Sequence, residues 1–213
     1  MWDFVSERSD QIAFSAWQHL SLVVQCLILA TVIAVGIAAL VYRSGPLRSV
    51  ANSVSAIGLT LPAFALVGLL IAPLGFGVAP AVAVVTFFAV LPILRNAVVG
   101  LAGIDPAVVE SARGIGMSRL RTLLRVELPL AWPVILGGIR VSAQMVMGIA
   151  AVAAYVLGPG LGGFIFSGLS RLGGENSIES VLTGVLGVVL LALLLDLVLV
   201  GIGRLTTPRG IRV

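Results

Sequence analysis

Very few side chains of this sequence could take part in chemistry. The 213 residues contain one histidine, His19, and one cysteine, Cys26, and all 13 basic residues are arginines. A Walker-type nucleotide site needs a P-loop lysine, and a metal site needs several ligands close together, so the sequence predicts neither. We expect His19 to be a solvated or capping residue just before an apolar stretch, and Cys26 to be an inert thiol inside it. The sequence therefore predicts no enzymatic activity, no catalytic residue, no metal and no cofactor.

Two charged residues lie within apolar stretches and need an explanation. Asp196 is the main candidate for a proton relay, which is how an ion-coupled carrier would use an intramembrane carboxylate. The favoured interpretation is that Asp196 pairs with Arg204 or with an arginine of another span. Arg140 is expected near the inner end of its stretch, where a long side chain can reach the membrane interface. Neither residue forms the chain of buried charges that a pump would need.

The elements that position these residues are long apolar stretches. The chain is 59% hydrophobic and only 10% charged, against roughly 25% charged residues in soluble domains. Five stretches are each close to the ~20 residues that a helix needs to cross ~30 Å of hydrocarbon. They are Leu20–Tyr42, Val54–Ala72, Val78–Leu94, Val134–Leu157 and Val181–Ile202. This pattern predicts an all-α, polytopic membrane protein with about five transmembrane helices.

The first stretch could instead be a cleaved signal peptide. The residues before it carry Asp3, Glu7 and Asp10 against only Arg8, whereas a signal peptide begins with a basic region and has a shorter apolar core. We therefore interpret the stretch as a retained helix.

The arginines predict the orientation of the chain. Eleven of the 13 arginines fall on one side of a five-span topology, and the positive-inside rule makes that side cytoplasmic. The N-terminus is then outside and the C-terminus inside. The predicted organisation is an external segment at 1–19, a single transmembrane domain at 20–204 with a cytoplasmic loop at about 100–129, and a cytoplasmic tail at 205–213. Topology explains the net charge of +4, so no nucleic-acid partner is predicted.

The cytoplasmic loop carries the most specific motif of the chain. Glu110-Ser-Ala-Arg-Gly-Ile-Gly116 continues to Val126-Glu-Leu-Pro129. This segment resembles the coupling loop of the permease subunits of binding-protein-dependent ABC importers, whose consensus reads Glu-Ala-Ala, three residues, Gly, nine residues, Ile, one residue, Leu-Pro. Every spacing agrees, and only Ser111 and Val126 depart from the consensus residue types.

The residues of the loop also predict its local structure. Asp105 can cap a helix that begins at Pro106, and Gly114 and Gly116 can end that helix and permit positive φ. Ser118 can cap a second short helix, with Leu120, Leu123, Leu124 and Glu127 on one face, and Pro129 and Pro133 would mark the turn into the next span. We expect two short helices at the membrane surface. Without the resemblance, a basic hairpin resting on anionic headgroups would be an equal alternative.

The resemblance implies a type I ABC importer permease fold and a loop that docks on a cytoplasmic ATPase. The residues that it assigns to coupling are Asp105, Glu110, Ser111, Ala112, Gly116 and Pro129. It also implies a second permease subunit, identical or paralogous, an external substrate-binding protein, and a place in the bacterial inner membrane.

A longer resemblance, from Ser55 to Asp196, points to the osmoprotectant branch of this family. It rests on segments such as Thr60-Leu-Pro62, Leu91-Pro-Ile-Leu-Arg-Asn96, Arg113-Gly-Ile-Gly-Met117 and Pro133-Val-Ile-Leu-Gly-Gly-Ile-Arg140. It implies import of quaternary amines such as glycine betaine, carnitine, choline or proline betaine, and it identifies no substrate residues. The alternatives are a permease for amino acids such as methionine, an ion-coupled secondary carrier, and a membrane scaffold.

Three further features have structural interpretations. Pro62 and Pro92 are expected to kink the second and third spans. Ala30, Ala34 and Ala38 form a stripe suited to close helix packing. The glycine-rich segment 158–168, expected outside, could be a lid, a surface for the binding protein or a flexible connector.

Overall fold

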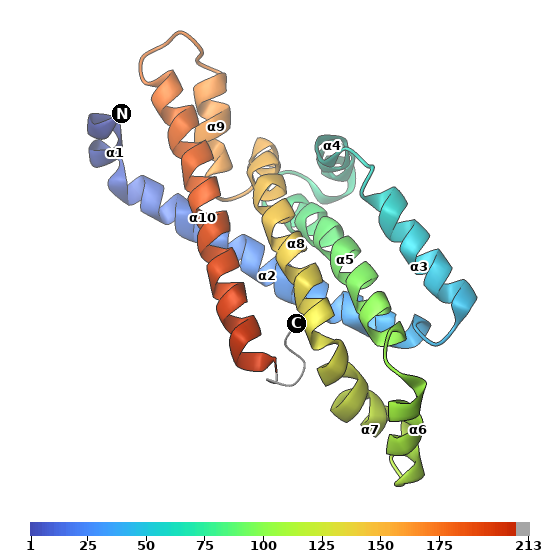
Figure 1. Cartoon of the computed structure of the whole chain (residues 1–213). Coiled ribbons are helices and arrows are strands. Elements are labelled where there is room, and N and C mark those ends of the chain that lie inside the picture. The colour runs from blue at the N-terminus through green and yellow to red at the C-terminus, as the bar shows by residue number, and fades with distance from the viewer. Residues whose placement is uncertain (208–213) are drawn as a thin grey trace.

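The computed structural model describes residues 1–207; the end of the predicted cytoplasmic tail, 208–213, lies outside the described residues. The described chain is helical, without a strand (Figure 1). Its elements are α1 (Trp2–Glu7), α2 (Ser9–Val41), α3 (Gly45–Gly58), α4 (Ala63–Leu74), α5 (Val78–Ala102), α6 (Pro106–Gly114), α7 (Arg119–Thr122), a π-helix (Leu123–Glu127), α8 (Leu128–Ala153), a 3-10 turn (Ala154–Val156), α9 (Gly162–Leu169) and α10 (Ser177–Thr206).

Within residues 1–207, four continuous helical segments are long and apolar enough to cross a membrane. They are Ser9–Val41, Val78–Ala102, Arg119–Val156 and Ser177–Thr206. Each coincides with a predicted span, so the prediction of an all-α membrane protein is confirmed. The first segment begins earlier than predicted, because residues 9–19 of the expected external segment already belong to α2.

The second predicted span is not one kinked helix. It consists of α3 and α4, which are bent by 95° and qualify as a broken span or a re-entrant loop. Pro62 lies in the break with extended backbone and precedes the first residue of α4. Proline disfavours helical geometry in the residue before it and cannot donate to the preceding turn. Pro92, in contrast, stays inside the helix α5.

The predicted turn before the fourth span is also wrong. The helix runs from Arg119 to Val156 without interruption and changes to π geometry at Leu123–Glu127. Pro129 lies in the first turn of α8, and Pro133 lies inside this helix. The second short helix of the loop is thus an extension of α8.

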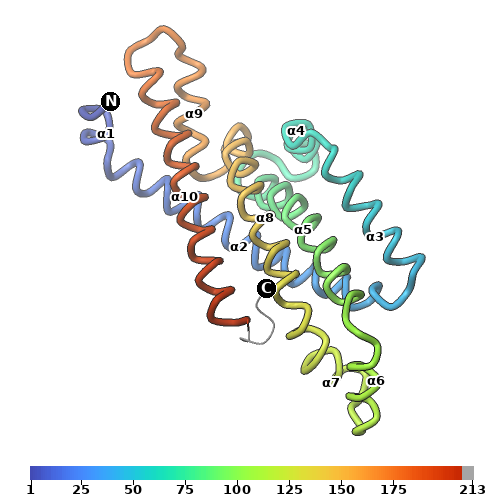
Figure 2. The backbone as a smooth tube through the Cα atoms, viewed as in Figure 1, coloured from blue at the N-terminus to red at the C-terminus, as the bar shows by residue number. Residues whose placement is uncertain are grey.

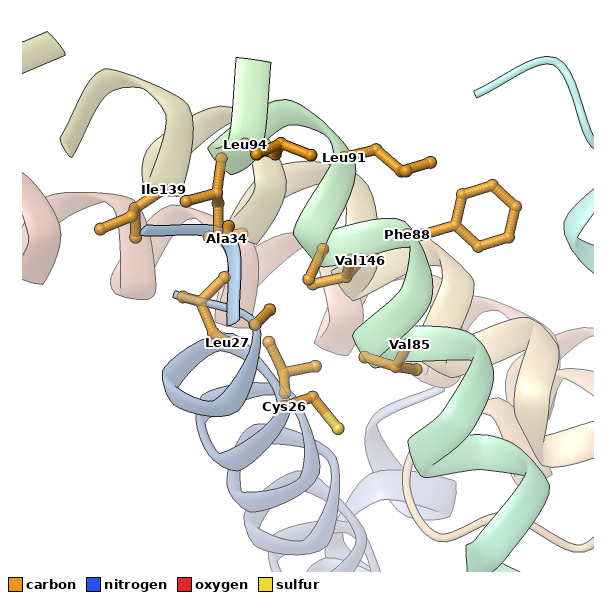
Figure 3. Packing of buried hydrophobic residues seen from close by; sticks show 14 of the residues in the cluster. Cys26, Leu27, Ala34, Val85, Phe88, Leu91, Leu94, Ile139 and Val146 are labelled. Carbon is orange, nitrogen blue, oxygen red and sulfur yellow. The ribbon is translucent and has the colours of Figure 1, made fainter. Parts of the chain in front are cut away.

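The core is formed where α5 packs between α2 and α8. Figure 3 shows Ala34 of α2, Leu94 of α5 and Ile139 of α8 converging there. The alanine stripe of α2 is fully buried, as predicted from its spacing, and short side chains let the helix backbones approach. Ser142 of α8 adds a buried hydrogen bond, since its hydroxyl donates to the Ala89 carbonyl oxygen at 2.7 Å.

We expect Ser142→Ala to lower the free energy of unfolding by only about 0.6 kcal/mol, the average for a hydrogen bond between membrane helices. Unfolding in detergent, followed by circular dichroism, measures this. Ser170→Ala is the control, because Ser170 is exposed and its hydroxyl bonds only within its own turn. A loss of several kcal/mol for Ser142→Ala would contradict the expectation.

The glycine-rich segment is largely structured. Gly162–Leu169 forms α9, which packs beside α10 (Figure 1). A Cβ atom on Gly162 would lie 2.1 Å from the Ala151 carbonyl oxygen, and one on Gly168 would lie 2.5 Å from that of Ser177. Side chains at these positions would separate the helices, so the interpretation as a flexible connector is wrong for this part.

His19 is fully buried, so its expected exposure to solvent is wrong. Its Nε2 lies 3.1 Å from the Met147 carbonyl oxygen, and a Cβ atom on Gly160 would lie 2.7 Å from its Nδ1. The early start of α2 places this residue inside the helix, against α8.

The two ends of the bundle carry different elements. Figure 2 shows the N-terminus, α4 and the connection between α9 and α10 at one end, while α6 and α7 extend from the opposite end. This arrangement agrees with the predicted topology, in which the arginine-rich loop and the N-terminus lie on opposite sides.

Candidate functional site: the α6–α7 hairpin

The hairpin begins with the predicted cap. The Asp105 carboxylate accepts a hydrogen bond from the Ala107 backbone N–H at 2.8 Å, and Pro106 occupies the first helical position. Ser118 caps α7 in the same way, accepting from the Arg121 backbone N–H at 3.4 Å. Side-chain oxygens at these positions satisfy N–H groups that have no partner within the helix.

Gly116 makes the turn between the two helices. Its φ is +90° and no atom lies within 4 Å of the position of an added Cβ. The turn is closed by the Gly116 N–H, which bonds to the Arg113 carbonyl at 2.9 Å, and by the Met117 N–H, which bonds to that of Ala112 at 3.2 Å. Gly114, which was also expected to break the helix, is the last residue of α6.

The predicted coupling residues differ in accessibility. Asp105, Glu110, Ser111, Gly116 and Pro129 are exposed, whereas Ala112 is buried. Ala112 therefore belongs to the packing inside the hairpin.

The tip of the hairpin exposes large apolar side chains. Ile115 is 77% exposed and Leu120 is 65% exposed. Ser111 lies one helical turn before Ile115, and its hydroxyl bonds to the Ala107 carbonyl oxygen at 2.7 Å within α6. The outer surface of α6 thus combines short side chains with an apolar tip, which suits insertion into a groove of another protein.

The base of the hairpin is anchored by a buried carboxylate that we did not predict as functional. Glu127 is 2% exposed. Its Oε2 accepts a hydrogen bond from the Tyr42 hydroxyl at 2.7 Å and forms an ion pair with Arg43 Nη2 at 3.1 Å. Arg43 Nε also donates to the Tyr42 hydroxyl oxygen. The cluster links the C-terminal end of α2 to the π-helix below α8.

The environment keeps Tyr42 protonated. This residue follows the last residue of α2, and burial, together with its hydrogen bond to Glu127, raises its pKa to about 12. A phenol is already protonated at neutral pH, and the raised pKa extends its role as a donor to the carboxylate into the alkaline range. In the sequence, the signal for this cluster is a charged residue, Glu127, between the apolar residues Val126 and Leu128. We had placed Glu127 on a leucine-rich helix face and so did not predict its ion pair.

A pocket of about 290 Å³ lies next to this cluster. It is lined by Glu110 and Arg113 of α6, by Arg43 just after α2, by Arg48 of α3, and by Glu127. The side of α6 that carries Glu110 thus faces the inner ends of the spans.

Asp196 has the partner that the favoured interpretation predicted. It forms an ion pair with Arg140 of α8, an arginine of another span. Arg140 lies in the interior of α8, because this helix begins before the predicted span.

The fold is shared with a solved ABC transporter. Among solved structures, the methionine ABC transporter MetNI in an inward-facing conformation contains a chain that matches with a TM-score of 0.78, covering 92% of this chain and 96% of that one. The sequence identity is 20%, so this likeness concerns the fold alone.

The sequence matches the family "Binding-protein-dependent transport system inner membrane component" over residues 30–208. The chain belongs to this family and is a multi-pass protein of the inner membrane. The carnitine transport permease protein OpuCB of Listeria monocytogenes is 34% identical over 209 residues, covering 98% of this chain and 94% of that protein. The osmoprotectant import permease protein OsmW of Salmonella typhimurium is 37% identical over 215 residues, covering 98% of both. The resemblance to the osmoprotectant branch is thereby confirmed.

Proposed function

We propose that this chain is the permease subunit of an ATP-driven importer of quaternary-amine osmoprotectants. The observation that carries the proposal is the identity of 34% and 37% to carnitine and osmoprotectant permeases over nearly the whole chain. The subunit forms part of the translocation path and leaves ATP hydrolysis to a partner. It works with a second permease subunit and with a binding protein that delivers the substrate from outside.

The α6–α7 hairpin is the part that docks on the ATPase. Its exposed residues Asp105, Glu110, Ser111, Gly116 and Pro129 belong to the docking region, while Ala112 supports it from inside. Figure 1 shows the hairpin continuing beyond the inner ends of α5 and α8. A projecting hairpin with an apolar tip favours a protein groove over the headgroup layer, where an amphipathic helix lies flat. The N-terminus is then outside and residues 205–207 are cytoplasmic.

Uptake by the complete transporter tests this function. A strain without other osmoprotectant uptake systems expresses the chain with its ATPase and binding protein, and uptake of labelled glycine betaine, carnitine and methionine is measured. We expect uptake of the quaternary amines that depends on ATP hydrolysis. Uptake of methionine alone, or uptake by the chain without an ATPase, would overturn the proposal.

Ser111→Arg is expected to abolish co-purification with the ATPase, because a long charged side chain would occupy the docking surface. Ser111→Ala is the matched variant, since the hydroxyl bonds only within α6. It is expected to leave uptake within about twofold of the original, as for most surface changes. Undiminished association of Ser111→Arg with the ATPase would argue against docking through this face.

A further inference from the structure

A polar cluster lies between α8 and α10, within the membrane-spanning part of the chain. Arg140 donates through Nε and Nη2 to the two carboxylate oxygens of Asp196, each at 2.9 Å. Gln144, one turn further along α8, donates to Asp196 Oδ1 at 3.2 Å. The side chains of Arg140 and Asp196 are 40% and 22% exposed, so the pair is open to its surroundings.

The cluster lies far from the helix ends. Arg140 lies inside the segment Arg119–Val156, and Asp196 lies inside the segment Ser177–Thr206, about 15 Å of helix before its last residue. The hydrocarbon layer is only ~30 Å thick. Both charged groups therefore belong to helices that are long and apolar enough to cross this layer.

Lipid is therefore an unfavourable neighbour for this cluster. A charged side chain at the centre of a spanning helix costs about 3 kcal/mol on insertion scales, and such residues face the interior of a bundle or a water-filled cavity. The guanidinium has N–H groups beyond the two that Asp196 accepts, and these need acceptors as well. Water or a polar ligand can supply them.

The face of α8 beside the cluster is open and has small residues. Gly137, Val141, Gln144 and Gly148 recur every three or four residues and share one side of the helix. Among the described residues, no atom lies within 4 Å of a Cβ added to either Gly137 or Gly148, and Val141 is 55% exposed. Residues 1–207 thus leave this face of α8 open.

We propose that Arg140 and Asp196 line the translocation path and bind the two charged groups of a zwitterionic quaternary amine. This inference rests on the proposed function. Arg140 takes the substrate carboxylate, because a guanidinium binds carboxylates through parallel N–H bonds. Asp196 takes the ammonium group, which has no N–H to donate and is held by charge. Without substrate the two residues neutralise each other, so the path carries no unpaired charge.

A pair of substrates tests the proposal. Glycine betaine and choline both carry a quaternary ammonium group, but only glycine betaine carries a carboxylate. In the complete transporter, Arg140→Gln is expected to reduce glycine betaine uptake about tenfold more than choline uptake, as expected for the loss of one charge-assisted hydrogen bond. Asp196→Asn is expected to reduce uptake of both.

Trp132→Phe is the matched control. Trp132 Nε1 donates to Thr206 Oγ1 at 2.7 Å across the same pair of helices, so the variant weakens their contact without changing a charge. It is expected to leave the ratio of the two uptake rates unchanged. Equal losses for both substrates in Arg140→Gln, or no loss, would overturn the inference. If the unaltered transporter takes up neither compound, that result contradicts the proposed function itself, and not only the role of Arg140 and Asp196.

Thiol labelling tests the path without relying on folding of the charge variants. Gln144→Cys, in a Cys26→Ser background, is expected to react with a charged, membrane-impermeant thiol reagent and to be protected by glycine betaine. Val32→Cys is the comparison, because Val32 lies on α2 and is 67% exposed away from the cluster; it should react without protection or not at all. Absence of labelling at Gln144→Cys, or labelling that glycine betaine does not slow, would contradict the inference.

Discussion

Glu127→Ala is expected to lower the free energy of unfolding by about 3 kcal/mol, the lower end of the cost of breaking a buried ion pair. The carboxylate is almost completely buried and accepts from both Tyr42 and Arg43. The cost stays at the lower end because the Arg43 side chain is 37% exposed and can turn to water. Denaturation of the purified protein in detergent, followed by circular dichroism, measures the change.

Glu127→Gln separates the charge of this residue from its shape, and Arg125→Ala serves as a surface control. Glu127→Gln keeps an oxygen that can accept from Tyr42, so we expect a smaller loss than for alanine. Arg125→Ala, an exposed position of the same π-helix, is expected to change stability by less than about 0.5 kcal/mol. If Glu127→Ala and Arg125→Ala were equally stable, the buried cluster would not anchor the hairpin.

The Glu127 cluster also has a consequence for coupling. The π-helix connects the hairpin to α8, and the ion pair connects it to α2. A movement of the hairpin can therefore reach two spans rather than one. Such coupling needs a physical connection with more than one arrangement, and π-turns inside helices are frequent at functional sites.

The existence of the spans was predictable because it depends on composition. Each needs only about twenty apolar residues in a row, and the sequence contains such stretches at α2, α5, α8 and α10. The break between α3 and α4 was harder to predict from the sequence. Pro62 and Pro92 both follow leucine in apolar stretches, yet α5 continues through Pro92 and the chain bends by 95° near Pro62. Whether a proline kinks a helix or ends it depends on how neighbouring helices pack against it. The spacing of residues in the sequence does not show that packing.

The hairpin was predictable to the extent that its signals are local. The Asp105 cap, the Ser118 cap and the positive φ of Gly116 each depend on residues a few positions apart, and all three are confirmed. Burial of Ala112, Glu127 and His19 depends on segments distant in the sequence. The partner of Glu127 is 84 residues away and the carbonyl beside His19 is 128 residues away, so no spacing rule could identify them.

Gly116→Ala is expected to reduce coupled uptake about tenfold, within the usual range of allosteric coupling, while the protein remains folded. A residue with a side chain loses roughly 1–2 kcal/mol in the left-handed region, and φ at this position is +90°. Since nothing surrounds the added methyl group, the strain is relieved by a change in the turn, which moves Ile115 and the rest of the docking tip. Uptake, ATPase association and thermal unfolding are measured on the same preparation.

Gly114→Ala is a closely matched control. It adds the same methyl group two residues earlier, also in open space but in helical backbone, where alanine is favoured. We expect that variant to transport normally. Equal uptake by the two variants would mean that the conformation of the turn does not matter for docking.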